Sequence, residues 1–129
     1  MKIEHLALNV ADPRAMARWY AEHLGMTVVR ALDAPPYTRF IADDGGAVML
    51  EIYCNPPDRV PDYAAMNPLL LHVAFLSSDP ARDKARLIAA GATEYSDLVL
   101  DDRSRIVILR DPWGLPIQLC KRATPLKDV

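Results

Sequence analysis

The stretch His72-Val73-Ala74-Phe75-Leu76-Ser77-Ser78-Asp79-Pro80 decides the fold, because it repeats His5-Leu6-Ala7-Leu8-Asn9-Val10-Ala11-Asp12-Pro13 near the start of the chain. In both copies a histidine opens an apolar alternating run, and an Asp-Pro pair follows seven residues later. Each copy continues into a helix-like segment that ends near a glycine, Gly25 in the first and Gly91 in the second. The offset is 72 − 5 = 67 residues, which indicates an internal duplication.

Each repeat is predicted to form one strand, one helix and three further strands, in the order βαβββ. Asp12 and Asp79 are suited to the N-cap of the two helices, because each precedes a proline that fits the first helical position. The pattern predicts strands over residues 3–10, 27–32, 37–42 and 47–54 and a helix over 13–24 in the first repeat, and strands over 69–76, 93–98, 105–110 and 115–121 and a helix over 80–90 in the second.

A chain of 129 residues is sufficient for one domain, and each half would be marginal alone, so we expect a single α+β domain of paired modules. Module 1 covers about residues 2–54 and module 2 about 69–122, with a proline-rich linker over 55–68 and a tail over 123–129.

Composition excludes several classes of function. The net charge of −2 lacks the clustered Lys and Arg that nucleic acids require. No apolar run is long enough to span a bilayer, and the N-terminus is a poor signal peptide, so we expect a cytoplasmic protein. Cys54 and Cys120 lack Cys-x-x-Cys spacing and are expected to be reduced thiols.

The repeat offset also relates two pairs of potential metal ligands. Counting 67 forward from His5 gives His72, and counting 67 forward from Glu51 gives Gln118. If the modules face a common cleft, these four side chains converge from four strands. Two imidazoles, a carboxylate and an amide oxygen suit a divalent ion such as zinc, nickel, cobalt, iron or manganese. Each histidine taken alone is also compatible with an ordinary strand residue, and the shared offset is what favours ligation.

The chain resembles the vicinal oxygen chelate superfamily, which includes glyoxalase I, methylmalonyl-CoA epimerase, fosfomycin-modifying enzymes, extradiol dioxygenases and bleomycin-resistance proteins. The resemblance covers residues 2 to about 122 and implies a curved eight-stranded mixed sheet around a cleft. It rests on the His-Leu-Ala-Leu-Asn-Val run at 5–10, Trp19-Tyr20 with Leu24-Gly25-Met26, Leu50-Glu51-Ile52, His72-Val73-Ala74, and Asp111-Pro112-Trp113-Gly114 leading to Ile117-Gln118-Leu119.

The resemblance implies metal ligation by His5, Glu51, His72 and Gln118, and a glyoxalase I-like lyase or isomerase that acts through an enediolate. Gln118 departs from the family pattern, in which this position carries glutamate. Because an amide cannot accept a proton at neutral pH, Glu51 is the remaining candidate for the catalytic base.

Two further readings stay open. A metal-free small-molecule binder of the bleomycin-resistance type fits the loss of the acid at Gln118. An extradiol dioxygenase or a fosfomycin-modifying transferase fits less well, because those enzymes carry the acid on the eighth strand. In each reading the partner is a small molecule, and family resemblance implies a homodimer. The candidate substrate contacts are Tyr53, Arg39, Arg105 and Cys120.

Overall fold

A computed structural model describes residues 1–126 of the chain. The chain divides into two compact units, Met1–Pro61 and a second that begins at Asp62. The boundary falls within the linker predicted over residues 55–68, which contains two short 3-10 turns in place of a plain loop. Each unit is described below by itself.

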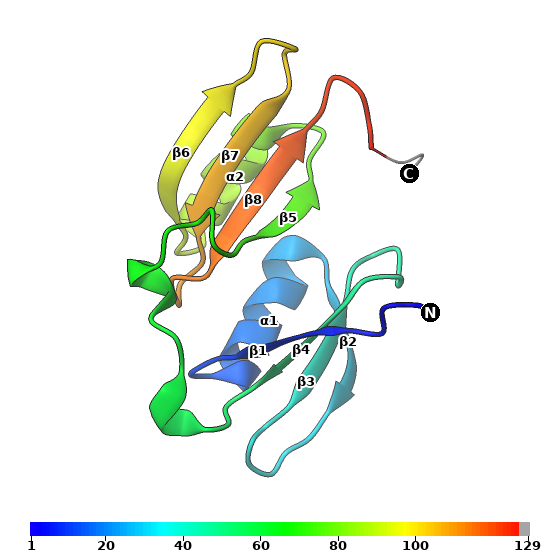
Figure 1. The fold of residues 1–129 in the computed structure, drawn as a ribbon, viewed down its shortest axis with the longest axis vertical. Helices are drawn as coiled ribbons and strands as arrows, with labels where there is room; N and C mark the ends of the chain where they lie inside the picture. The colour runs from blue at the N-terminus through cyan, green and yellow to red at the C-terminus, as the bar shows by residue number, and fades with distance from the viewer. Residues whose placement is uncertain (127–129) are drawn as a thin grey trace. The chain divides into compact units, whose positions relative to one another are not determined.

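The first unit is a four-stranded mixed sheet with one helix. Its elements are β1 (Leu6–Asn9), α1 (Pro13–Leu24), β2 (Thr27–Ala31), β3 (Arg39–Ala42), β4 (Met49–Tyr53) and the turn η1 (Pro57–Arg59). The strand order is β1-β4-β3-β2, with β1 parallel to β4 and the other pairs antiparallel. α1 contacts β2, β3 and β4 and so covers one face of the sheet (Figure 1).

The second unit repeats this architecture. Its elements are the turn η2 (Tyr63–Ala65), β5 (Val73–Leu76), α2 (Pro80–Ala89), β6 (Thr93–Val99), β7 (Arg105–Arg110) and β8 (Pro116–Lys121). The strand order β5-β8-β7-β6 matches that of the first unit, and α2 contacts β6, β7 and β8 (Figure 1). The predicted βαβββ tandem and the α+β class are therefore confirmed, with the eight strands divided between two four-stranded sheets.

Identical capping explains why the two helices begin where the sequence predicts. The Asp12 carboxylate accepts a hydrogen bond from the Ala15 backbone N–H at 3.0 Å, and Asp79 accepts one from Arg82 at 3.1 Å. These bonds satisfy backbone donors that have no partner inside the helix. α1 ends at Gly25, whose φ of 68° is the left-handed conformation that glycine adopts readily.

The register of the strands matches the duplication residue by residue. Ala7 of β1 pairs with Glu51 of β4, and Ala74 of β5 pairs with Gln118 of β8. Both members of the second pair lie 67 residues after those of the first, since 74 − 7 and 118 − 51 are equal. The constant offset found in the sequence is therefore a structural equivalence.

Several strands are shorter than predicted, for local reasons. β5 begins at Val73 because Asn67 forms a turn in which the Leu70 N–H donates to its carbonyl. β3 begins at Arg39 because Tyr37 has a left-handed φ of 60°, which interrupts an extended strand. β1 likewise starts at Leu6, so that each histidine precedes the first strand of its unit.

Side chains alternate along the strands between a buried face under the helix and an open face. On β4, Leu50 and Ile52 are buried while Glu51 is half-buried on the other side. On β8, Ile117 and Leu119 are buried under α2, and Gln118 lies opposite to them. Neither of the two helices found in residues 1–126 is long and apolar enough to cross a membrane.

Candidate metal and ligand site

The first half of the predicted ligand set is assembled on the open face of the first sheet. His5 Nε2 lies 3.1 Å from Glu51 Oε2, although His5 precedes β1 and Glu51 is in the middle of β4. The two side chains are 31% and 21% exposed, so both are partly shielded yet reachable by a ligand.

His5 also contacts a second carboxylate. Its Nδ1 is hydrogen-bonded to Glu4 Oε2, so both ring nitrogens face carboxylate oxygens. Since a carboxylate oxygen can only accept, Nδ1 carries the proton that is donated to Glu4. The other ring nitrogen, Nε2, faces the Glu51 carboxylate, so a divalent ion placed between them would contact both groups. Glu4 is the type of outer partner that orients a metal-binding histidine.

His72 has the same arrangement in the second unit. Its Nδ1 lies 2.8 Å from the carbonyl oxygen of Pro68, which can only accept, so Nδ1 is again the protonated nitrogen. The other ring nitrogen, Nε2, is therefore the one available to a metal ion. A backbone carbonyl bound to the far nitrogen is a common way to fix the tautomer and direction of a metal ligand.

Gln118 lies on the open face of the second sheet beside Cys120. The Cys120 thiol donates to Gln118 Oε1 at 2.8 Å, so the amide oxygen already has one partner and retains a second lone pair. Burial raises the pKa of the Cys120 thiol, which keeps it protonated and a donor. The predicted placement of Cys120 on the same face as Gln118 is thus what the structure shows, with Cys120 only 4% exposed.

Arg39 lies on the opposite face of the first sheet from Glu51. It pairs in register with Ile52, which is buried under α1. Its guanidinium donates to the carbonyl oxygens of Leu32, Tyr37 and Thr38 and pairs with Asp33 at 3.3 Å. The structure therefore does not bring Arg39 together with Glu51.

Arg105 is similarly separated from Gln118. Gln118 pairs with Ile108, three residues further along β7, so Arg105 projects from the face that α2 covers. Arg105 makes two hydrogen bonds to Asp97, at 2.9 and 2.8 Å, and Lys84 of α2 reaches the same carboxylate at 2.6 Å. These two cations hold the pKa of Asp97 well below its usual range.

Tyr53 is on the same face as Glu51, two residues along β4, and pairs with Asn9 of β1. The Asn9 side chain accepts from the Asn55 N–H at 2.8 Å and donates to the Pro56 carbonyl at 2.9 Å. Tyr53 therefore lies at the end of β4. The backbone that follows it, at Asn55 and Pro56, is held by hydrogen bonds to the Asn9 side chain.

The residues present have the donor chemistry for a divalent ion. Both histidines have Nδ1 hydrogen-bonded to an oxygen, which leaves Nε2 as the ring nitrogen available to an ion, and the Nε2 of His5 faces the Glu51 carboxylate. Within residues 1–126, no three His, Cys, Asp or Glu side chains lie close enough together to hold a metal ion. The four ligands predicted from the sequence are not a group of that kind, because one of them is the amide of Gln118. His5 and Glu51 belong to the first unit, and His72 and Gln118 belong to the second.

A cavity of about 310 Å³ lies elsewhere in the first unit. Its walls include Arg14, Tyr37 and Cys54, and the Arg14 guanidinium lies 4.0 Å from the centre of the Tyr37 ring. His5, Glu51 and Tyr53 are not among the described residues that line it. The cavity is therefore separate from the predicted ligand site.

Comparison with known proteins identifies the family. The family model of the Glyoxalase/Bleomycin resistance protein/Dioxygenase superfamily matches residues 2–119. The chain belongs to this superfamily. No curated protein matches the chain.

Solved structures give the same fold. A glyoxalase family protein from Enterococcus faecalis is 27% identical, with 93% of this chain and 97% of that chain covered and a TM-score of 0.68. A glyoxalase family protein from Bacillus cereus is 15% identical over 96% and 95% of the chains, with a TM-score of 0.79. TnmS3, an antibiotic binding protein from a Streptomyces species, is 20% identical over 95% and 98%, with a TM-score of 0.67. Glyoxalase family proteins and an antibiotic binding protein thus share the fold described here.

Sequence reasoning missed the outer partners of both histidines. Alternation along the strand predicted over residues 3–10 places Glu4 on the face opposite His5, but β1 begins only at Leu6, so this alternation does not apply to Glu4. The Pro68 carbonyl is a backbone group in a segment predicted as loop or strand. Phe40, which lies beside His5 and Glu51, and Arg30, which lies near the Phe40 ring, were also missed.

Proposed function

We propose that this protein binds a divalent metal ion through His5, Glu51, His72 and Gln118 and catalyses a glyoxalase-type proton transfer on a small substrate with adjacent oxygen atoms. The observation that carries the proposal is that both imidazoles have Nδ1 hydrogen-bonded to an oxygen. Each donates from Nδ1 to an oxygen, which makes Nε2 the ligand atom, and the Nε2 of His5 is already 3.1 Å from a carboxylate oxygen.

The ion would polarise adjacent substrate oxygens and stabilise negative charge that develops on them. The chain's own contribution is the movement of the proton. Glu51 is half-buried and is the only carboxylate in the proposed set, so it removes the proton from the substrate carbon and returns it to the neighbouring carbon. His5, held by Glu4, fixes the position of the Glu51 carboxylate.

Gln118 is a neutral ligand in this scheme. Its oxygen accepts from Cys120 and cannot take up a proton at neutral pH. The family's usual acid at this position is thereby replaced, and proton transfer depends on Glu51 alone. Substitution of Glu51 in the first unit is therefore expected to lower turnover more than substitution of Gln118 in the second.

The test uses the hemithioacetal of methylglyoxal and glutathione as substrate, after reloading the protein with zinc, nickel, cobalt, iron or manganese in turn. Glu51→Gln preserves the shape of the side chain but removes the base. Turnover should fall by a factor of about 100 or more, while the bound metal remains, because positioned acid–base groups contribute about that much. Glu94→Gln, which alters a carboxylate bound by Lys84, is the matched control. Unchanged turnover in Glu51→Gln would remove this residue from the mechanism.

A second candidate is metal-free binding of a small molecule. The structural neighbour TnmS3 is an antibiotic binding protein. The observation that favours it is the hydrogen bond from Cys120 to the Gln118 oxygen, which gives that oxygen a partner without any metal. If the protein is a metal-free binder, its ligand affinity is the same before and after treatment with a chelator. If it is a metal-dependent enzyme, the chelator abolishes turnover.

We further propose that the protein forms a homodimer. Large apolar side chains are exposed on the strands of the second unit, including Leu76 at 65% and Val99 at 70%. Burial of such side chains stabilises association. Light scattering coupled to size-exclusion chromatography distinguishes one copy of 14.4 kDa from two.

A further inference from the structure

Three side chains of the first unit converge on the ring of Phe40. The His5 ring meets it edge-on with the ring centres 5.8 Å apart, and the Arg30 guanidinium lies 5.9 Å from its centre. Glu51 is its direct neighbour across β3 and β4. Phe40 is thus the apolar centre of the open face, with the proposed metal pair on one side and Arg30 on the other.

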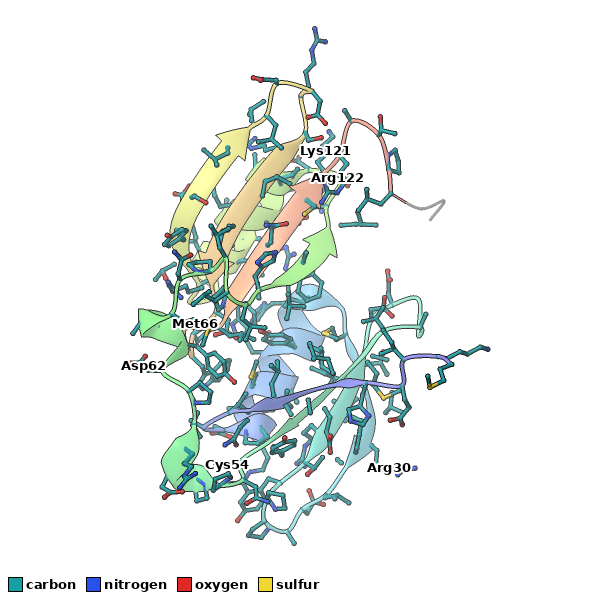
Figure 2. All side chains as sticks on the ribbon, in the orientation of Figure 1. Arg30, Cys54, Asp62, Met66, Lys121 and Arg122 are labelled. Atoms are coloured by element: carbon teal, nitrogen blue, oxygen red, sulfur yellow. The ribbon has the colours of Figure 1, made fainter. Side chains whose placement is uncertain are left out.

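Arg30 differs from the two arginines that sequence reasoning selected. The guanidinium groups of Arg39 and Arg105 bind backbone carbonyls or carboxylates of their own unit. Within residues 1–126, the guanidinium of Arg30 has no hydrogen bond or ion pair, and it lies near the ring of Phe40. Its residue is exposed on the edge strand β2, at the border of the sheet in Figure 2.

A bulge between Val28 and Arg30 places this side chain on the open face. Arg30 pairs with Phe40, and Phe40 pairs with Glu51, so the three residues form one row across neighbouring strands. Strands are about 4.8 Å apart, so the backbones of Arg30 and Glu51 are roughly 10 Å apart. A cation and a carboxylate are therefore neighbours of one aromatic ring, on opposite sides of it in this row.

We infer that Arg30 is the specificity-determining residue of the site and that the ligand is a small carboxylic acid with an apolar or aromatic body. Its carboxylate binds the Arg30 guanidinium, its body lies over Phe40, and its adjacent oxygens point to His5 and Glu51. This inference rests on the proposed function for the last contact only. A guanidinium is well suited to a carboxylate, because it donates two parallel hydrogen bonds.

The test compares two probes that differ only in charge at one end, 3,4-dihydroxybenzoate and 3,4-dihydroxybenzamide. Both carry adjacent oxygens, an aromatic ring and a group opposite to them. Binding is measured by calorimetry without oxygen, on the full chain, with and without zinc. The variants are Arg30→Gln, Arg30→Lys and the control Arg18→Gln, which removes an exposed positive charge from α1.

The wild-type protein should bind the acid about tenfold or more tightly than the amide, as expected for one charge-assisted pair. Arg30→Gln should lower the affinity for the acid to that for the amide and leave the amide unaffected. Arg30→Lys should restore part of the preference, and Arg18→Gln should have no effect. Equal affinities in the wild-type protein, an Arg30→Gln variant that keeps the preference, or no binding of either probe overturns the inference.

The zinc-free measurement separates this inference from the proposed function. If only the metal proposal fails, zinc leaves both affinities unchanged and the Arg30-dependent preference for the acid persists. If only the Arg30 inference fails, zinc strengthens the binding of both probes to the same extent.

Discussion

His5 Nε2 and Glu51 Oε2 lie 3.1 Å apart on the open face of the first sheet, although 46 residues separate them in the chain (51 − 5). Parallel pairing of β1 with β4 produces this proximity, since Ala7 lies opposite Glu51 and His5 is two residues earlier. The same pairing in the second unit sets Ala74 opposite Gln118, with His72 two residues earlier. Each βαβββ unit thus has a histidine just before its first strand and an oxygen-bearing side chain, Glu51 or Gln118, on the strand paired with it.

Glu4→Ala should weaken metal binding several-fold, because Glu4 orients the His5 ring and increases the basicity of Nε2. Glu22→Ala is the matched control, since Glu22 also lies beside a histidine that follows it, His23, at 3.9 Å. Zinc titration by calorimetry measures both. Equal affinities in the two variants would contradict the orienting role of Glu4.

Gln118→Glu should increase metal affinity by about tenfold or more, because a carboxylate attracts a cation more strongly than an amide does. The Cys120 thiol can still donate to the new side chain, so the local packing is retained. Competition with a chromogenic chelator measures the change. If the affinity stays at the wild-type value while the fold is intact, Gln118 is not a ligand.

Asp97→Asn should destabilise the protein by about 2 kcal/mol at pH 7, because Arg105 and Lys84 lose a charged partner. The folded state lowers the pKa of Asp97, so its contribution is complete above the unfolded pKa of about 4 and is lost as the pH falls further. The difference between wild type and variant should therefore be smaller at pH 2.5 than at pH 7. Urea denaturation at both pH values tests this.

The control for that experiment is Asp101→Asn, which changes an exposed carboxylate in the turn between β6 and β7. Its stability should equal that of the wild type at both pH values. If Asp97→Asn is as stable as Asp101→Asn at pH 7, the ion pairs of Asp97 with Arg105 and Lys84 do not contribute to stability.

Gly114→Ala should be severely destabilising, by more than about 3 kcal/mol. Gly114 has a φ of 86°, and an added Cβ would lie 2.7 Å from the backbone nitrogen of Ala64. Gly25→Ala is the matched control, since its φ of 68° is also left-handed but its surroundings are open. It should cost about 1 kcal/mol. If urea denaturation gives the same loss of stability for Gly114→Ala and Gly25→Ala, then η2 moves away from the added Cβ at Gly114 without an energetic penalty.

The duplication, the order of elements and the structural equivalence of Glu51 with Gln118 were predictable because they depend on local signals. The Asp-Pro pairs start both helices, and a constant offset keeps equivalent residues on equivalent faces. On β4, polar Glu51 between Leu50 and Ile52 gives a clear alternation, so its face could be assigned.

The face of each arginine was not predictable. On β3, Arg39 precedes two apolar residues, Phe40 and Ile41, so no alternation reveals which side carries the helix. On β7, Arg105 is followed by four apolar residues, with the same ambiguity. Arg30 reaches the open face through a bulge, and a bulge changes the register without a signal in the composition.

The most direct test of the account is the metal content of the purified protein, prepared without chelator and measured by elemental analysis. The wild-type protein and the His23→Ala control should each contain one divalent ion per site, and the His5→Ala, His72→Ala double variant should contain none. A double variant that retains the wild-type metal content, or a wild-type protein that neither contains nor takes up a divalent ion, would contradict the proposed metal site.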